Sequence, residues 1–413
     1  MSEIVMTEIV VGIALFSLII LGLVAAILFA RSKLIPSGLV HIKIGNAPEK
    51  SFDTGCGDKL MAALGDNGIF LASACGGQGI CGQCRVKVLS GGGTILPLET
   101  NQINAHDAAD GYRLGCQVTV NQSMMLELPE QILSVRQWEC EVRANDNVAT
   151  FIKELVLTLP EGEEIDFEPG SYVLLEAPAH HIRFSEFDVA QRFRGDWDAL
   201  DLWRIESFCK EPVKRAYTMA NYPGEGHALK FNIRITLPPA ATQGIPPGQM
   251  SSYLFSLKPG DRVVVSGPYG DFFPRYTNKE MIYIGGGSGM APLRSHINYL
   301  LREKGESRKI SFWYGARSRD ETFYVQEFDA LQAQYSNFSW YVSLSQPKPQ
   351  DDWHGNIGYI HKLLYETYLK DHSAPEDCEY YICGPPMMMD SIIAMLTDLG
   401  VEQDSIYFDD FST

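Results

Sequence analysis

Basic residues are scarce in this chain. Of its 413 residues, 34 are lysine or arginine and 51 are aspartate or glutamate, which gives a formal net charge of −17. Because this charge repels phosphate backbones and anionic lipid, it argues against nucleic-acid binding and against broad electrostatic adsorption to a membrane. A disulfide framework is also missing, since nine cysteines are an odd number in a chain far longer than a small secreted domain. The length predicts two to four domains.

One segment contains no charged residue. It runs from Ile9 to Ala30 and is long enough to cross a bilayer as a helix. A cleaved signal peptide would have a basic region before a shorter apolar run, whereas Glu3 and Glu8 precede this one. Arg31 and Lys33 follow it, so the positive-inside rule places the N-terminus outside and the rest of the chain in the cytoplasm. With no ionisable side chain inside the span, residues 1–35 are predicted to be an anchor and not an ion pathway.

The cysteines that follow lack the second C-x2-C pair of a typical zinc site. Cys75, Cys81 and Cys84 have the spacing C-x5-C-x2-C, and Cys116 stands alone further on. Four thiolates are the ligand set of a [2Fe–2S] cluster, and these four residues are its predicted ligands. Glycines between them allow left-handed backbone and close approach to the sulfides. They are Gly76, Gly77, Gly79 and Gly82.

This spacing resembles that of plant-type and vertebrate-type [2Fe–2S] ferredoxins. The resemblance implies a β-grasp domain of the α+β class over residues 36–130. Its first gap is one residue longer than the plant-type gap. Cys56 lies outside the motif and is predicted to be a structural thiol.

Many short strand-like segments separated by turn-forming residues predict an antiparallel β-barrel over residues 131–275. Within it lies the motif Arg-Ala-Tyr-Thr, residues 215–218, which resembles the flavin signature of the ferredoxin–NADP reductase superfamily. The resemblance implies that Arg215 pairs with the FAD pyrophosphate, Tyr217 stacks on the isoalloxazine ring and Thr218 bonds near N5. A later segment looks like a glycine turn opening a helix, which suits phosphate. Its predicted FAD contacts are Gly248, Met250, Ser251 and Ser252.

Residues 180–210 interrupt the strand pattern of the predicted barrel. A loop of this length is usually functional or disordered, and Trp197 and Trp203 favour an ordered insertion. We hypothesise that it docks the partner that accepts electrons, because aromatic residues are enriched in interface cores. An excursion without a role remains the alternative.

Strands and helices alternate over residues 276–413, which predicts a doubly wound, Rossmann-like α/β domain. The fingerprint G-x-G-x-x-G is absent, and a different glycine turn joins the first strand to its helix. The predicted cofactor contacts in that turn are Gly285, Gly286, Gly287, Ser288 and Gly289. Arg317 and Arg319 follow the second strand, where a 2′-phosphate could bind, so these residues leave NADH and NADPH both open.

The motif Cys-Gly-Pro-Pro begins at Cys383 where the fourth strand of this domain ends. It is the second match to the ferredoxin–NADP reductase superfamily. The resemblance implies that Cys383 lies beside the nicotinamide C4 and the flavin N5, with Gly384 and Pro385 at the cofactor. It also implies that an aromatic residue near the end covers the flavin. Phe411 is the candidate and Phe408 the alternative.

These parts in this order define a chain of electron carriers: NADH, FAD, then a [2Fe–2S] cluster. Soluble oxygenase reductases share them but lack the anchor. The whole chain is similar to the F subunits of sodium-translocating NADH:quinone oxidoreductases. That resemblance favours NADH and implies membership of a respiratory complex in the bacterial inner membrane, reaching quinone indirectly through partner subunits. A membrane-tethered oxygenase reductase and a non-enzymatic electron carrier are the alternatives.

Overall fold

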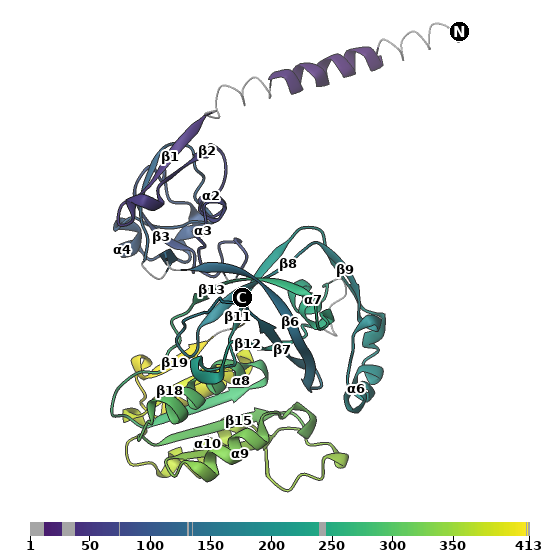
Figure 1. Ribbon diagram of the computed structural model, residues 1–413, viewed down its shortest axis with the longest axis vertical. Helices are drawn as coiled ribbons and strands as arrows, with labels where there is room; N and C mark the ends of the chain where they lie inside the picture. The colour runs from purple at the N-terminus through teal and green to yellow at the C-terminus, as the bar shows by residue number, and fades with distance from the viewer. Residues whose placement is uncertain are drawn as a thin grey trace, which may run out of the picture. The chain divides into compact units, whose positions relative to one another are not determined.

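The structure is a computed structural model that describes residues 12–26, 38–73, 75–129, 132–133, 135–238, 245–409 and 411. The chain forms two compact units (Figure 1). The first comprises residues 1–71 and 77–134, and the second comprises 72–76 and 135–413. The predicted boundary at residue 275 falls inside the second unit and stays a prediction.

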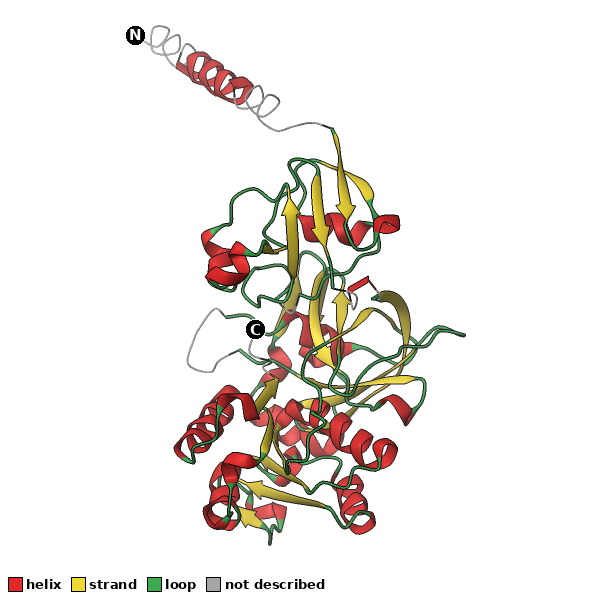
Figure 2. Ribbon diagram, turned by 90° about the vertical axis from the view of Figure 1, so that its left-hand side faces the viewer, coloured by secondary structure: helices red, strands yellow, loops and turns green. Residues whose placement is uncertain are grey.

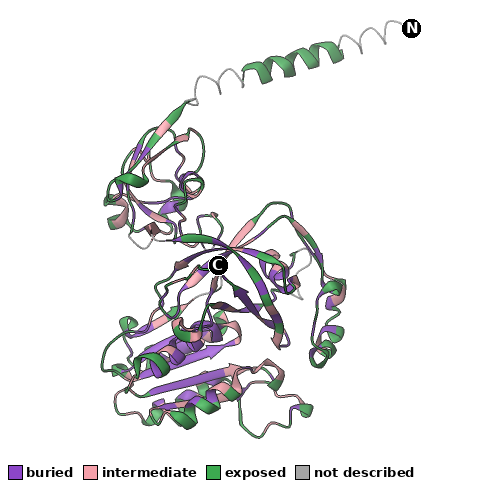
Figure 3. Ribbon diagram, viewed as in Figure 1, coloured by how far each residue is buried: buried purple, intermediate pink, exposed green. Residues whose placement is uncertain are grey.

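The predicted membrane span is described only in its middle part. Residues 12–26 are helical and exposed (Figure 3), whereas residues 9–11 and 27–30 lie outside the described residues. Among the residues that the structure describes, no helix is long and apolar enough to cross a bilayer. The anchor therefore stays a prediction.

The first unit is a mixed five-stranded sheet of order β2-β1-β5-β3-β4. Strands β1 and β5 are parallel, and the other pairs are antiparallel. Helix α2 packs Leu60, Ala63 and Leu64 into the same core as Ile42 and Ile44 of β1, so the unit has the predicted α+β arrangement. The elements are β1 (Leu39–Ile44), η1 (Pro48–Lys50), β2 (Phe52–Gly55), α2 (Leu60–Asp66), β3 (Arg85–Ser90), α3 (Pro97–Thr100), α4 (Ala105–Ala109), β4 (Tyr112–Leu114) and β5 (Met124–Glu127).

The second unit begins with a six-stranded antiparallel sheet of order β11-β8-β13-β6-β7-β12. In the described part of the chain no ladder joins the edge strands β11 and β12, so the predicted barrel is an open half-barrel. Its apolar face packs with α7 around one core. The elements are β6 (Arg136–Ala149), β7 (Ile152–Thr158), β8 (Tyr172–Ala177), β11 (Val213–Thr218), η5 (Pro223–Glu225), β12 (Ala228–Arg234), α7 (Gln249–Ser256) and β13 (Arg262–Tyr269).

The insertion leaves the half-barrel between β8 and β11, which are neighbouring strands paired from Ala177↔Val213 onward. It is ordered, as predicted, and Trp197 is 0% exposed within the half-barrel core. Trp197 therefore serves the chain's own core and is not available to the interface that we hypothesised from it. The elements are β9 (His180–Arg183), η2 (Phe184–Glu186), η3 (Gln191–Phe193), α6 (Arg194–Ala199), η4 (Leu202–Arg204) and β10 (Glu206–Cys209), with β9 and β10 paired.

The second unit ends in a parallel six-stranded sheet of order β17-β16-β15-β14-β18-β19, with helices on both faces (Figure 2). Strand β14 turns Met281 and Tyr283 to the core of α8 and α9, and Ile282 and Ile284 to the core of α10 and α11. This burial on both faces is the predicted doubly wound pattern (Figure 3). The strands are β14 (Met281–Gly286), β15 (Ile310–Ala316), β16 (Phe338–Leu344), β17 (Asn356–Ile357), β18 (Glu379–Cys383) and β19 (Ile406–Asp409).

Helices connect these strands. The long ones are α8 (Met290–Asn298), α9 (Val325–Gln334), α10 (Ile360–Thr367) and α11 (Pro386–Asp398). The short ones are η6 (Gly287–Gly289), η7 (Tyr299–Lys304), η8 (Arg319–Glu321), η9 (Pro349–Asp351), η10 (Leu369–Asp371), η11 (Pro375–Asp377) and η12 (Gln403–Ser405).

Candidate functional site

The strand order of the parallel sheet reverses between β14 and β18. From β14 the chain proceeds outward through β15, β16 and β17, and then returns to the other side of β14 with β18 and β19. In open α/β sheets, ligands bind outside the carboxyl ends of the strands at such a reversal. Both predicted nucleotide motifs begin there, since Gly285 and Cys383 are Cα partners across β14 and β18.

The two glycine turns pack directly on each other. A Cβ on Gly289 would lie 2.1 Å from the Cys383 carbonyl oxygen, and one on Gly384 would lie 3.2 Å from the Gly286 nitrogen. Gly287 has a φ of 60°, the left-handed region in which glycine carries no penalty. Ser288 is half-buried within the turn, and Pro385 caps α11. Because α8 starts directly after this turn, its N-terminal amides face the same crevice, which fits the phosphates of a dinucleotide.

Cys383 lies in the core at this position and is 0% exposed. Its Cα partner on β19 is Asp409, and Thr218 Oγ1 donates a hydrogen bond to Asp409 Oδ2 at 3.0 Å. The structure therefore brings the predicted Thr218 and Cys383 to the two sides of Asp409, a residue that the sequence reasoning missed. Its signal was a carboxylate at the end of an otherwise apolar strand.

The two aromatic candidates for covering the flavin are both accessible. Phe408 lies on β19 next to Asp409 and is 46% exposed, and Phe411 is 43% exposed. Exposure alone does not choose between them, so the assignment of Phe411 stays a prediction.

The predicted flavin residues lie on edge strand β11 of the half-barrel. Arg215 and Tyr217 are half-buried, and Tyr217 packs against the half-barrel core. Burial raises the pKa of Tyr217, so its phenol stays neutral at physiological pH. Arg215 Nη1 donates to the carbonyl oxygen of Lys214 at 2.7 Å, which leaves other donors of its guanidinium for an anion.

Helix α7 begins directly after Gly248, as the predicted glycine turn requires. The hydroxyls of Ser251 and Ser252 donate back to the Gly248 carbonyl at 3.2 and 2.7 Å. These side chains and that of Met250 are at most 5% exposed. A Cβ on Gly248 would lie 2.7 Å from Thr236 Cβ, so glycine is required for close packing. A phosphate would therefore be held by the backbone amides of this turn and not by the hydroxyls.

Three of the predicted cluster ligands, Cys75, Cys81 and Cys84, lie in a glycine-rich loop, and Cys116 follows β4. Cys81 is half-buried and the other three are buried. Cys84 Sγ lies 3.3 Å from Cys116 Sγ, and the charge of Cys81 acts on Cys84. Hydrogen bonds from Cys84 and Gln117 lower the pKa of Cys116 to about 6, whereas the contact with Cys116 raises the pKa of Cys84. Cys75 is buried within residues 72–76 of the second unit. A thiolate at neutral pH is the species that iron binds, so the donors fit a cluster.

The backbone of this loop bears out the expectation for its glycines. All four adopt the left-handed region, where a side chain would be strained. The φ values are 64° at Gly76, 90° at Gly77, 78° at Gly79 and 70° at Gly82.

Arg294 joins the parallel sheet to the half-barrel from a buried position on α8. Its guanidinium donates to the Ala220 carbonyl at 2.7 Å and to both oxygens of Glu225 at 2.7 and 2.9 Å. Nε donates to Glu327 on α9 at 3.0 Å. Burial by itself would raise the pKa of Glu225, but bonds from Arg294 and Lys230 hold it below its usual range.

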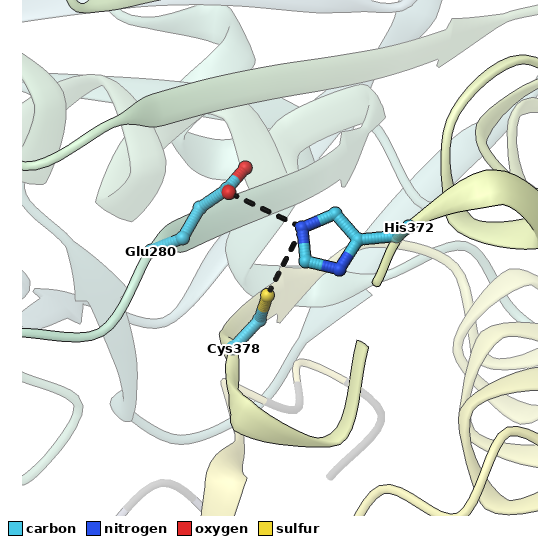
Figure 4. Close-up of side chains that lie close together, drawn as sticks. All are labelled: Glu280, His372 and Cys378. Atoms are coloured by element: carbon cyan, nitrogen blue, oxygen red, sulfur yellow. Dashed lines mark hydrogen bonds and ion pairs between the residues drawn. The ribbon is translucent and has the colours of Figure 1, made fainter. Parts of the chain in front are cut away.

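A group of metal-ligating side chains lies at the opposite edge of the sheet, before β14 and β18 (Figure 4). His372 Nε2 lies 3.4 Å from Glu280 Oε2 and 3.9 Å from Cys378 Sγ. The Ala374 amide donates to His372 Nδ1 at 3.2 Å, so Nε2 carries the proton of the neutral ring. A histidine that binds a metal donates through its other nitrogen instead, so we assign no metal here.

Curated relatives match almost the full chain. It is 55% identical to a protein of Marinomonas sp. over 404 residues, which is 98% of each chain. It is 53% identical to a protein of Idiomarina loihiensis over 98% of this chain and 100% of that one. Both relatives are named as the F subunit of a Na(+)-translocating NADH-quinone reductase. The chain belongs to this F-subunit family.

Three protein-family models match consecutive parts of this member of the F-subunit family. They are a 2Fe-2S iron-sulfur cluster binding domain at residues 45–121, an oxidoreductase FAD-binding domain at 204–273 and an oxidoreductase NAD-binding domain at 283–393. The predicted cofactor set of [2Fe–2S], FAD and NADH is confirmed at this level. The order of the three domains along the chain is also the predicted one.

Solved structures support the fold of this F-subunit family member. The Amycolatopsis cytochrome P450 reductase GcoB has a TM-score of 0.62 over 90% of this chain and 98% of that one. Because the sequence identity is 22%, this match shows a common fold alone.

Proposed function

We propose that this chain is the electron-input subunit of a membrane respiratory complex. It oxidises NADH by hydride transfer to FAD and passes single electrons through the [2Fe–2S] cluster to partner subunits. The complex then reduces quinone and translocates sodium. The observation that carries the proposal is identity of 53–55% to F subunits over 98% of the chain, with all three cofactor domains present.

The reaction needs the dihydronicotinamide held at the reversal between β14 and β18. There the amides of the Gly285–Gly289 turn and of α8 meet the NADH phosphates, and Gly384 and Pro385 form the other wall. The buried Cys383 lies at the floor of this crevice, where its side chain positions the nicotinamide ring. Thr218, oriented by its bond to Asp409, bonds near flavin N5, and Phe411 covers the ring.

FAD, when bound, supplies the change from two-electron to one-electron transfer. The chain holds it with groups of one half-barrel edge and one helix. Arg215 neutralises the pyrophosphate, Tyr217 stacks on the ring, and the α7 amides after Gly248 meet phosphate oxygens. Cys75, Cys81, Cys84 and Cys116 hold the cluster that receives the electrons.

The anchor places these domains at their partners. Residues 9–30 span the bacterial inner membrane once, with the N-terminus outside and the soluble domains in the cytoplasm. The role of the span is attachment, because it contains no ionisable group that could conduct sodium.

The test is purification of the chain from native membranes under mild conditions. We expect co-purifying membrane subunits, NADH oxidation with ferricyanide, and sodium-dependent quinone reduction by the complex. Co-purification with an oxygenase would instead support the membrane-tethered oxygenase reductase. Absence of NADH–ferricyanide activity in a preparation that carries flavin would overturn the catalytic role and leave an electron carrier.

A further inference from the structure

The insertion reaches from the half-barrel to the loops of the parallel sheet. Its helix α6 carries Asp196, whose Oδ2 lies 2.7 Å from Lys348 Nζ. The same Lys348 nitrogen lies 3.3 Å from Asp320 Oδ2 in η8. All three side chains are between 27% and 33% exposed, so the pairs are partly shielded from solvent.

The insertion is rigid enough to act as a support. Trp197, next to Asp196, has its ring 5.8 Å from that of Phe255 and donates from Nε1 to the Thr150 carbonyl at 2.9 Å. The Thr150 amide in turn donates to the Asp320 carbonyl at 3.3 Å. Packing and a hydrogen bond therefore hold α6 in place independently of the ion pair between Asp196 and Lys348.

The loops that it reaches follow β15 and β16. Arg319 donates from its amide to Asp351 Oδ2 and from Nη1 to the Asp351 carbonyl, both at 3.0 Å. The Lys348 amide donates to the same Asp351 oxygen at 2.8 Å, and the Gln346 amide donates to the Arg317 carbonyl at 2.8 Å. The two loops thus form one bonded surface, and Lys348 is its link to the insertion.

This surface lies at the carboxyl edge of the sheet, the edge at which dinucleotides bind. The nicotinamide end belongs at β14 and β18, so the adenosine end extends over β15 and its neighbour β16. We propose that the insertion is a positioning element of the NADH site: Asp196, through Lys348, holds the loops after β15 and β16 in the geometry that receives the adenosine half. The inference rests on the proposed function and gives the insertion a role within the chain.

The test uses steady-state NADH oxidation with ferricyanide by the cofactor-loaded full chain. Asp196→Asn and Lys348→Met should each raise KM for NADH about fivefold and leave kcat unchanged, because the remote half is bound equally in ground and transition states. The double variant should be no worse than Lys348→Met alone, since that substitution already removes the partner of Asp196. Asp201→Asn, an exposed acid of the same insertion, is the matched control and should have no effect.

Reduced nicotinamide mononucleotide, which lacks the adenosine half, sharpens the test. Its KM should be the same for the wild type and both variants, because it cannot reach the loops. An unchanged KM for NADH in the variants would overturn the inference. So would equal losses with both donors, which would indicate general damage. Failure of the wild type to oxidise NADH would instead refute the proposed function, so the two failures are distinguishable.

Discussion

The cluster-binding loop and the strand-end crevice both bring several side chains to one cofactor, but they do so in opposite ways. In the loop, Cys81, Cys84 and the glycines that shape the backbone lie within a few residues of one another. In the crevice, Thr218 and Asp409 are bonded although they are 191 positions apart, and Cys383 comes from a third strand. The first site is encoded by local spacing, and the second by the register of strands from two sheets.

This difference predicts how each site fails. A local site loses its cofactor when one ligand is lost, because no neighbouring group can replace a thiolate. A site assembled from several strands should keep its cofactor when one side chain is lost, but the reacting groups should be less well aligned. The reason is that each side chain contributes only part of the positioning. Variants of single residues in the two sites, and the response of the two units to pH, test that contrast.

Cys84→Ala should abolish the cluster while FAD stays bound and reducible by NADH. Three thiolates do not hold a normal [2Fe–2S] centre, and the flavin residues lie on β11 and α7. The measurement combines EPR of the reduced protein with flavin bleaching by NADH. Cys56→Ala is the control, because this half-buried thiol lies in the same unit outside the motif. A wild-type EPR signal in Cys84→Ala would refute the ligand assignment.

Cys383→Ala should slow flavin reduction by NADH on the order of a hundredfold, since misplacing the donor by about 1 Å has that effect. Stopped-flow absorbance of the flavin band measures the rate, and flavin content should be unchanged. Cys378→Ala removes a similarly buried thiol just before the far end of the same strand and should leave the rate intact. Equal rates in the two variants would reduce Cys383 to a packing residue.

Asp409→Ala should slow the same step about tenfold, because Thr218 loses the acceptor that orients its hydroxyl, and a hydrogen bond to a charged group is worth about 1.5–3 kcal/mol. Thr218→Val should give a similar loss. The double variant should be close to either single one, which a double-mutant cycle measures. Additive losses would show that the two side chains act independently.

A further contrast distinguishes the stability of the two units by its pH dependence. Burial lowers the pKa of His296 to about 3. As the pH falls, the unfolded chain therefore binds a proton at His296 at a higher pH than the folded chain does. The second unit should therefore lose stability as pH falls from about 6.5 towards 3, at about 1.4 kcal/mol per pH unit. In the first unit, burial would raise the pKa of Glu99, but Arg113 holds it below its usual 4.5. Its contribution is complete above pH 4.5 and is lost only below that value.

Urea unfolding between about pH 7 and pH 4.5 measures the difference, with flavin fluorescence reporting on the second unit and hydrogen exchange of the β1 and β5 amides reporting on the first. His296→Gln keeps a donor for the Phe272 carbonyl and should remove most of the slope from the second unit. An unaltered slope in this variant would assign the pH dependence to other groups.

The contrast also explains what the sequence could and could not predict. The glycine turn at Gly285 and the Cys383 motif were placed at strand ends by pattern alone, and a parallel sheet brings such ends to one edge. Asp409 was missed because its value depends on lying beside Cys383 in β19 and within reach of Thr218, and register is not readable from one strand. Trp197 was misjudged for a related reason: an aromatic residue suits an interface and a core equally well, and only the folded insertion shows which one it joins.

The half-barrel shows the same limit. Alternating strands predicted an antiparallel barrel, and the strands are present, but closure depends on whether β11 and β12 meet. These two strands lie at opposite edges of the six-stranded sheet. Whether the barrel closes is therefore set by the curvature of the whole sheet and not by any residue of either strand. The phosphate contacts at Gly248, Met250, Ser251 and Ser252 stay a prediction, and the motif alone could not show that both serine hydroxyls bond to the Gly248 carbonyl.

The buried position of Arg294 has a mechanical consequence. Separating α8 from the half-barrel would break the two hydrogen bonds between Arg294 and Glu225, while Arg294 would keep Glu327 and Glu225 would keep Lys230 as partners. Since α8 begins directly after the glycine turn, these bonds tie the turn to the half-barrel. Movement of the turn away from the half-barrel therefore requires a charge-assisted, largely buried pair of hydrogen bonds to break.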